Sequence, residues 1–254
     1  MARLPRICLP GHAHHVVQRG HNGQPIVLDD VDRTCWRQVL ADAAVTHRVD
    51  VHAWQLLDEH FHLVLTPATA DGLARMMQAL GRRHAAGFNR RHGRTGTLWE
   101  GRFRSSLVQS GPWLLDCLLY VESHAARTGV AAQGVDGPWS SLGHHLGARR
   151  DPLVVEPPAW WSLGNTPFDR EMAWRARLEA GLAPEVAGRI TQATRRGWPL
   201  GDEAFLRTLE PATGRAVSPR PRGRPASVRP SRHPPSVPKA DSPDEIPDHN
   251  VPFY

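Results

Sequence analysis

The sequence predicts an α+β fold in which helices pack on one antiparallel sheet. Segments of strand and helix character follow one another in the order strand, helix, strand, strand, helix, strand, helix over about residues 8–130. The chain has 254 residues, of which 40% are hydrophobic and 22% charged, and this is enough material for a substantial core. The order of the elements is that of the ferredoxin-like βαββαβ arrangement, followed by one more helix.

Three strands and one helix are expected in the first 66 residues. Residues 11–20, GHAHHVVQRG, favour a short strand that ends at a glycine. A helix that Asp29 or Asp30 can cap follows, because its apolar residues recur at helical spacing. Residues 51–57 and 60–66 are the next two strands. The two residues between them suit a tight antiparallel turn.

A helix, a strand and a second helix complete the arrangement. Residues 70–90 predict a helix with Leu73, Met76 and Leu80 on its apolar side. Residues 104–110 favour the fourth strand. The last helix is expected from about Pro112 to Arg127, because proline is favourable in the first turn.

The composition divides the chain into three predicted parts. Residues 1–130 form the domain described above, residues 131–210 a small helical appendage, and residues 211–254 a tail. Within the appendage, helices are expected at 167–181 and 183–196. Eleven of the 23 prolines lie in the tail. Such a segment buries too little apolar area to order itself, so we expect the tail to be disordered.

The charge is basic and almost entirely due to arginine. There are 31 basic residues against 25 acidic ones, for a net charge of +6, and Lys239 is the one lysine. The planar guanidinium of arginine fits pairs of phosphate oxygens. A biased arginine usage could explain the missing lysines, but it would not cluster the arginines. Nucleic acid is therefore the first partner to consider.

Several protein classes are excluded by composition. No stretch approaches the roughly 20 apolar residues of a membrane span, and the first residues hold no apolar run of signal-peptide length. The cysteines Cys8, Cys35 and Cys117 are too few and too scattered for a disulfide framework or a cysteine zinc site. We therefore expect a cytoplasmic protein that does not contact membranes.

Two histidines on the predicted third strand form a candidate metal site. Side chains alternate along a strand, so His60 and His62 share one face while Phe61 points to the core. Imidazoles about 7 Å apart along a strand can share a divalent metal. A chance His-apolar-His triplet is the competing interpretation, because the chain has 15 histidines.

A tyrosine and a histidine on the last predicted helix form a second candidate. Tyr120 and His124 are four residues apart and share a helix face. A tyrosine hydroxyl can attack phosphorus and form a covalent intermediate, and a histidine one turn away can supply a third metal ligand. A half-buried tyrosine packed against the sheet is the simpler alternative.

Arginines and aromatic residues alternate between residues 82 and 104, where Glu100 is the one acid. Arginines bind phosphates and aromatic rings stack on bases, which is the pattern of single-stranded nucleic acid binding. A solvated basic helix end is the alternative. The predicted DNA-binding residues of this segment are Arg82, Arg83, Arg90, Arg91, Arg94, Trp99, Arg102, Phe103 and Arg104.

These motifs together resemble a known family. HFH on a strand, RTGTLWEGRFRSSLV after a basic helix, and LLYVESHAARTG are similar to the single-tyrosine HUH transposases, and specifically to the REP-associated tyrosine transposases, relatives of insertion-sequence transposases. The opening HHVVQRGHNGQPIVLDDVDR, GPWSSL and WWSLGNTPFDRE resemble the same branch. The similarity spans about residues 3–210, with the motifs in the expected order.

The resemblance implies a ligand set and a nucleophile. His60 and His62 would bind a divalent metal, Mg²⁺ or Mn²⁺, and Tyr120 would be the nucleophile. His124 stands where the family usually has asparagine or glutamine. Imidazole favours softer ions such as Mn²⁺ or Zn²⁺ over Mg²⁺.

The function implied is cutting and rejoining of single-stranded or hairpin DNA, such as palindromic repeats, through a 5′-phosphotyrosine intermediate, by a monomer or a homodimer. One alternative is a domesticated DNA-hairpin-binding protein with little or no catalysis. Another is a metal-dependent phosphodiesterase that uses activated water and forms no covalent adduct.

The tail holds one further candidate motif. Residues 221–225 read PRGRP, and an arginine-glycine-arginine core can lie in a narrow AT-rich minor groove. Arg222 and Arg224 are the residues predicted to do so. Residues 211–240 contain six arginines and no acid, so a general electrostatic tether is the alternative.

Overall fold

The computed structural model describes residues 6–129, 137–214 and 216–218. The described residues up to residue 218 belong to one compact unit. The predicted disordered tail beyond residue 218 and the motif with Arg222 and Arg224 lie outside the described residues. None of the helices in the described ranges is long and apolar enough to cross a membrane.

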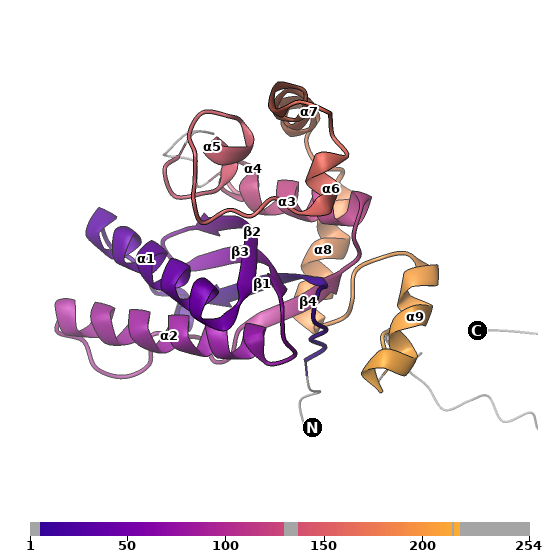
Figure 1. Ribbon diagram of the computed structural model, residues 1–254. Coiled ribbons are helices and arrows are strands. Elements are labelled where there is room, and N and C mark those ends of the chain that lie inside the picture. The colour runs from indigo at the N-terminus through magenta and orange to yellow at the C-terminus, as the bar shows by residue number, and fades with distance from the viewer. Residues whose placement is uncertain (1–5, 130–136, 215, 219–254) are drawn as a thin grey trace, which may run out of the picture. The chain divides into compact units, whose positions relative to one another are not determined.

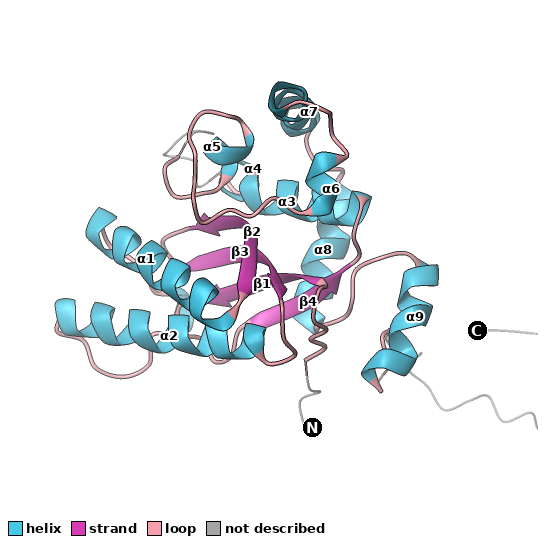
Figure 2. Cartoon of the chain, viewed as in Figure 1, coloured by secondary structure: helices cyan, strands magenta, loops and turns pink. Residues whose placement is uncertain are grey.

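Four strands form one antiparallel sheet in the order β2-β3-β1-β4 (Figures 1 and 2). Their bounds are Ala13–Arg19 (β1), Val49–Leu56 (β2), His60–Pro67 (β3) and Arg104–Val108 (β4). The strand that contains HFH lies between β2 and β1. The ferredoxin-like fold is therefore confirmed, and the HFH motif lies on a central strand of the sheet.

Helices cover both faces of the sheet. Helices α1 and α2 pack on one face, where Trp36, Phe61 and Leu80 are buried in a common core. Helices α3 and α8 pack on the other face, where Val64 and Ile190 share a second core. Figure 2 shows the sheet between α1 and α2 on one side and α3 on the other. The described helices are α1 (Asp30–His47), α2 (Gly72–Arg91), α3 (Pro112–Glu122), α4 (His124–Arg127), α5 (Leu142–His145), α6 (Pro158–Trp161), α7 (Pro167–Ala180), α8 (Pro184–Arg196) and α9 (Glu203–Thr213), with a short 3-10 turn at His21–Gly23.

The predicted helix 112–127 is divided into α3 and α4 at Ser123. The Ser123 hydroxyl donates a hydrogen bond to the Leu119 carbonyl at 2.6 Å, and such a side-chain bond competes with continuation of the helix. The division does not separate the two candidate residues, because the rings of Tyr120 and His124 lie 6.0 Å apart.

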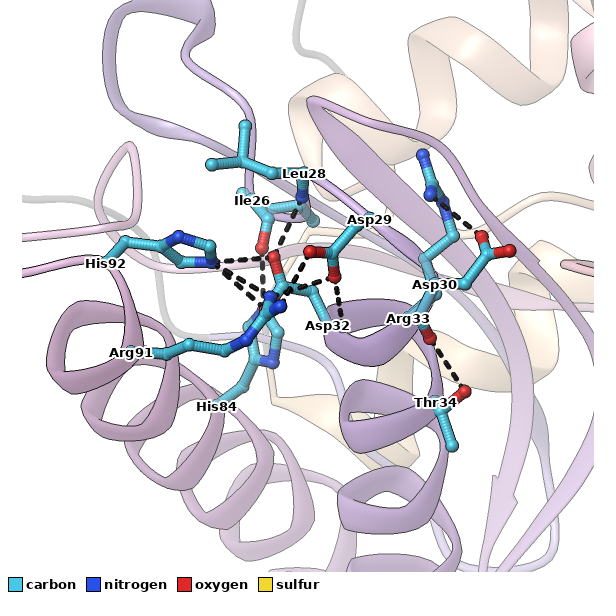
Figure 3. Close-up of polar contacts among 10 residues, drawn as sticks. All are labelled: Ile26, Leu28, Asp29, Asp30, Asp32, Arg33, Thr34, His84, Arg91 and His92. Atoms are coloured by element: carbon cyan, nitrogen blue, oxygen red, sulfur yellow. Dashed lines mark hydrogen bonds and ion pairs between the residues drawn. The ribbon is translucent and has the colours of Figure 1, made fainter.

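An ionic network joins the start of α1 to the end of α2 (Figure 3). Asp29 caps α1 by accepting from the Asp32 backbone amide. Arg91 binds Asp29 and Asp32, each at 2.6 Å, and His92 reaches Asp32 at 2.9 Å. The hydrogen bond from Arg91 lowers the pKa of Asp29 to about 2. The Arg91 guanidinium is thus engaged by two carboxylates.

The segment after residue 137 is joined to α3 through a fully buried carboxylate. Glu122 accepts hydrogen bonds from the Ser141 hydroxyl, from His145 Nδ1 at 2.6 Å and from Trp174 Nε1 at 3.0 Å. The predicted helices 167–181 and 183–196 are present as α7 and α8. Helix α9 ends at Thr213, so helix continues past the expected start of the tail at residue 211.

We expect the Glu122→Ala variant to lose about 3–5 kcal/mol of unfolding free energy, because three buried donors would lose their acceptor at once. Urea denaturation of the purified variant measures this loss. Glu179 is exposed on α7, so Glu179→Ala should change the unfolding free energy by less than about 0.5 kcal/mol. Equal stability of the two variants would show that the buried carboxylate does not hold the segment to α3.

Candidate metal centre and nucleophile

Three histidines converge on the sheet face that α3 covers. His60 and His62 share this face because they are two residues apart on β3. His124 comes from the first position of α4. One nitrogen from each of the three side chains lies within 4.8 Å of the others, and the Nε2 atoms of His60 and His124 are 3.1 Å apart.

These three side chains fit a divalent cation. Zinc–nitrogen bonds are about 2.0–2.1 Å long, so two nitrogens that bind one ion lie roughly 3 Å apart, as the Nε2 atoms of His60 and His124 do. The Nδ1 atom of His60 is buried without a hydrogen-bond partner among the described residues. The donor set consists of imidazoles alone, which suits Mn²⁺ or Zn²⁺ better than Mg²⁺.

The three imidazoles are held in the form that binds metals. Burial lowers the pKa of His60 to about 4. Burial and the neighbouring His60 lower the pKa of His124 to about 3. The pKa of His62 falls well below its usual value, because this side chain is buried and is next to other histidines. All three rings are therefore neutral at pH 7, as metal ligation requires.

Tyr120 lies beside the three histidines and is largely buried. Its ring centre is 5.9 Å from that of His62 and 6.0 Å from that of His124. The hydroxyl is 2.9 Å from Thr191 Oγ1 on α8. Because the Thr191 hydroxyl donates to the Ala187 carbonyl, it accepts the hydrogen bond from Tyr120. Only 6% of the tyrosine is exposed.

An arginine covers the nucleophile candidate and contacts the third histidine. The Arg127 guanidinium carbon lies 4.1 Å from the centre of the Tyr120 ring. Arg127 donates to the Tyr120 carbonyl at 2.7 Å, and the same nitrogen is 3.3 Å from His124 Nδ1. A positive charge therefore lies next to both side chains.

The arginines of the predicted segment 82–104 lie on both faces of the sheet. Arg82, Arg83, Arg90 and Arg91 lie on α2, on the face opposite the histidines. Arg83 is paired with an aspartate on α1 at 2.8 Å, and Arg91 is held by the network of Figure 3.

Two exposed arginines lie on the same face of the sheet as the histidines. Arg104 on β4 pairs in register with Val17, which in turn pairs with His62, so Arg104 points to the histidine face. It donates to the carbonyl of Arg195 at 2.7 Å. Arg19 on β1 is opposite His60.

Two further arginines of the segment have no acidic partner within the described ranges. Arg102 forms no ion pair, and Arg94 donates a hydrogen bond to the side chain of Gln24.

The aromatic residues of this segment contribute to the core. Trp99 donates to the Gly81 carbonyl at 2.9 Å and packs edge-on against Phe61. Phe103 is 9% exposed, and the Arg6 guanidinium covers its ring at 3.7 Å. Stacking on a base needs an open ring face, so we leave Trp99 and Phe103 out of the DNA-binding surface proposed below.

Sequence reasoning missed several residues around the centre. His15 on β1 lies 3.0 Å from His62, and alternation along the strand turns its neighbour His14 to the other face. Thr191 and Thr194 come from α8, and no local pattern marks them as neighbours of β1 or α3. Arg127 marks only the end of the last predicted helix, and its local sequence indicates no role.

Comparison with known proteins finds a matching family model and similar solved structures. Residues 9–124 match the family model described as IS200-like transposase. Among solved structures, the chain is similar to a REP-associated tyrosine transposase bound to a REP hairpin, with 17% identity and a TM-score of 0.50 over 63% of this chain and 93% of that chain. A protein from Deinococcus radiodurans R1 described as a transposase has 18% identity and a TM-score of 0.33, over 51% of this chain and 91% of that chain. No curated protein matches.

Proposed function

We propose that the chain cuts and rejoins single-stranded or hairpin DNA through Tyr120, because residues 9–124 match the family model described as IS200-like transposase. The observation that supports this proposal most is the position of the tyrosine ring, about 6 Å from two of three convergent histidines. The proposed nucleophile and the proposed metal ligands thus lie side by side.

The proposed reaction is a phosphoryl transfer that conserves bond energy. The Tyr120 oxygen bonds to the scissile phosphorus and gives up its proton, while the bond from phosphorus to the 3′ oxygen breaks and that oxygen gains a proton. The products are a 5′-phosphotyrosine link and a free 3′-hydroxyl. Attack by a 3′-hydroxyl reverses the step and rejoins the strand, so no nucleotide is consumed.

The side chains around Tyr120 have distinct proposed roles. His60, His62 and His124 would hold a divalent ion, which supplies Lewis-acid neutralisation of the charge on the phosphate. Arg127 would donate to a phosphate oxygen and keep the tyrosine ring in place. These groups act by positioning and by charge, as phosphoryl transfer requires.

The proposed partner is hairpin DNA, as in the solved transposase that is bound to a REP hairpin. Arg19 and Arg104 lie on the histidine face, and we propose that they bind the phosphates of the strand that enters the site. The arginines of α2 lie on the other face. They would contact DNA only if it wraps around the end of the sheet.

Incubation with labelled hairpin DNA and Mn²⁺ tests the proposed function. We expect an adduct between protein and DNA that survives denaturation. DNA cleavage without an adduct would favour the hydrolytic phosphodiesterase.

A binding protein with little catalysis is the second candidate function. It is favoured by the burial of Tyr120 and by the hydrogen bond that holds its hydroxyl to Thr191. To attack DNA, the hydroxyl must leave Thr191, or the phosphate must reach the hydroxyl while this hydrogen bond remains. Hairpin binding with neither adduct nor cleavage, in Mn²⁺ or in Zn²⁺, would support this candidate.

We expect DNA binding to weaken steeply as salt rises, because each arginine–phosphate contact releases counterions. Arg104→Ala should weaken hairpin binding and reduce the slope of log K against log[salt] by about 1. Arg83→Ala is the matched control, since Arg83 is paired with an aspartate on the opposite face. Fluorescence anisotropy at several salt concentrations measures both slopes. A larger effect of the control would place the DNA on the α2 face.

A further inference from the structure

His15 is a buried histidine that contacts a proposed metal ligand, and both of its ring nitrogens lie against other side chains. Its Nε2 atom lies 3.0 Å from Nδ1 of His62, and the two rings stack with an interplanar angle of 11°. On its other side, Nδ1 lies 2.7 Å from Thr194 Oγ1 on α8. Thr194 Oγ1 is in turn 3.0 Å from Ser106 Oγ on β4. His15, Thr194 and Ser106 are each no more than 3% exposed.

These contacts form one chain of hydrogen bonds that can run in either direction. If His62 Nδ1 carries a hydrogen, it donates to His15 Nε2, His15 Nδ1 donates to Thr194, and Thr194 donates to Ser106. If the direction is reversed, the donor of each hydrogen bond becomes its acceptor and the acceptor becomes its donor. All three hydrogen bonds are kept in either case, which matters because a buried unpaired polar group is costly.

Metal binding at His62 selects one of the two directions. The Nδ1 atom of His62 is taken by His15, so the atom free to bind an ion is Nε2. A neutral imidazole that binds through Nε2 must carry its hydrogen on Nδ1. That hydrogen needs an acceptor, and His15 Nε2 is the one that lies in place.

We propose that His15 is a positioning residue for the metal ligand His62, and that Thr194 of α8 holds His15 in the tautomer that this role requires. The proposal rests on the metal centre of the proposed function. It extends the centre to a helix that lies beyond the matched residues 9–124. The segment predicted as an appendage would thus contribute directly to metal affinity.

The size of the effect follows from other metal sites. Groups that orient a metal-binding histidine typically change metal affinity or activity by about 10- to 100-fold when they are removed. We expect His15→Phe to raise the dissociation constant for Mn²⁺ by this amount, because phenylalanine keeps the stacked ring but accepts no hydrogen bond. His15→Gln should restore most of the affinity, since its amide can accept from His62 and donate to Thr194.

The test uses the full chain and two measurements besides cleavage. Calorimetric titration with Mn²⁺ gives the dissociation constant of each variant, and the visible spectrum of bound Co²⁺ reports on the ligand geometry. Thr194→Val should weaken Mn²⁺ binding in the same direction as His15→Phe. Thr191→Val is the matched control, one turn away on the same helix, and should leave the Mn²⁺ dissociation constant unchanged because Thr191 contacts Tyr120 instead.

The outcomes separate this proposal from the proposed function. If wild-type protein binds neither Mn²⁺ nor Co²⁺, the metal centre is wrong and this inference falls with it. If wild-type protein binds metal and His15→Phe, with an unchanged melting temperature, binds it equally well, the role of His15 is wrong while the proposed function stands. If His15→Phe does not fold, Thr194→Val decides, and an unchanged dissociation constant there overturns the proposal.

Discussion

We expect the Tyr120→Phe variant to lose both adduct formation and strand cleavage while it still binds hairpin DNA. The loss should be at least about 10⁴-fold in cleavage rate, because removal of a nucleophile removes the covalent route altogether. Binding should change little, since the substitution removes one hydroxyl and no arginine. The ring remains, so the stacking of Arg127 on it is kept.

The small number of tyrosines limits where a phosphotyrosine adduct can form. The chain has two, Tyr120 and Tyr254, so a phosphotyrosine adduct must form at one of them. Tyr254 is the last residue and lies outside the described residues. Tyr254→Phe is therefore the matched control and should affect neither cleavage nor binding. Denaturing gels with labelled DNA measure the adduct, and anisotropy measures binding.

Two results would contradict the assignment of Tyr120. If Tyr120→Phe cleaved at a rate comparable to wild type, the attacking group would be water or another side chain, and the hydrolytic phosphodiesterase would be favoured. If Tyr254→Phe lost the adduct instead, the nucleophile would come from the tail.

The sequence could predict that the histidines come together, because the rules that place them are local. Alternation along a strand put His60 and His62 on one face, and a spacing of four put Tyr120 and His124 on one side of a helix. The second rule succeeded although the helix is divided at Ser123, because the rings remain 6.0 Å apart.

The surroundings of the centre could not be predicted, because they depend on contacts between distant segments. Thr194 is 179 residues from His15 in the chain and 2.7 Å from it in space. No periodicity in the sequence of α8 indicates which sheet face it covers. The arrangement of the arginines in segment 82–104 could not be predicted for the same reason, because the segment runs from α2 on one face of the sheet to β4, where Arg104 points to the histidine face.

The second large effect is expected from loss of the metal. A chelator should abolish cleavage by wild-type protein and leave hairpin binding largely intact, and added Mn²⁺ should restore cleavage better than added Mg²⁺. The reason for the preference is the ligand set of three imidazoles, since Mg²⁺ prefers oxygen ligands. His124→Asn introduces an amide oxygen, so the cleavage restored by Mg²⁺ should come closer to the cleavage restored by Mn²⁺ in this variant.

His62→Asn should lose metal binding most severely among the three ligands. His62 is 4% exposed and lies at the centre of the cluster, in contact with both other ligands and with His15. An ion that binds only the folded protein stabilises it by an amount that grows with the logarithm of the ion concentration divided by the dissociation constant. Mn²⁺ should therefore raise the melting temperature of the wild-type protein but not that of this variant. His47→Ala, at the end of α1 and away from the cluster, should keep the full Mn²⁺ response. If His62→Asn kept the Mn²⁺-induced rise in melting temperature and the cleavage activity, the ion would have to bind elsewhere, and the histidine cluster would be a packing feature of the sheet.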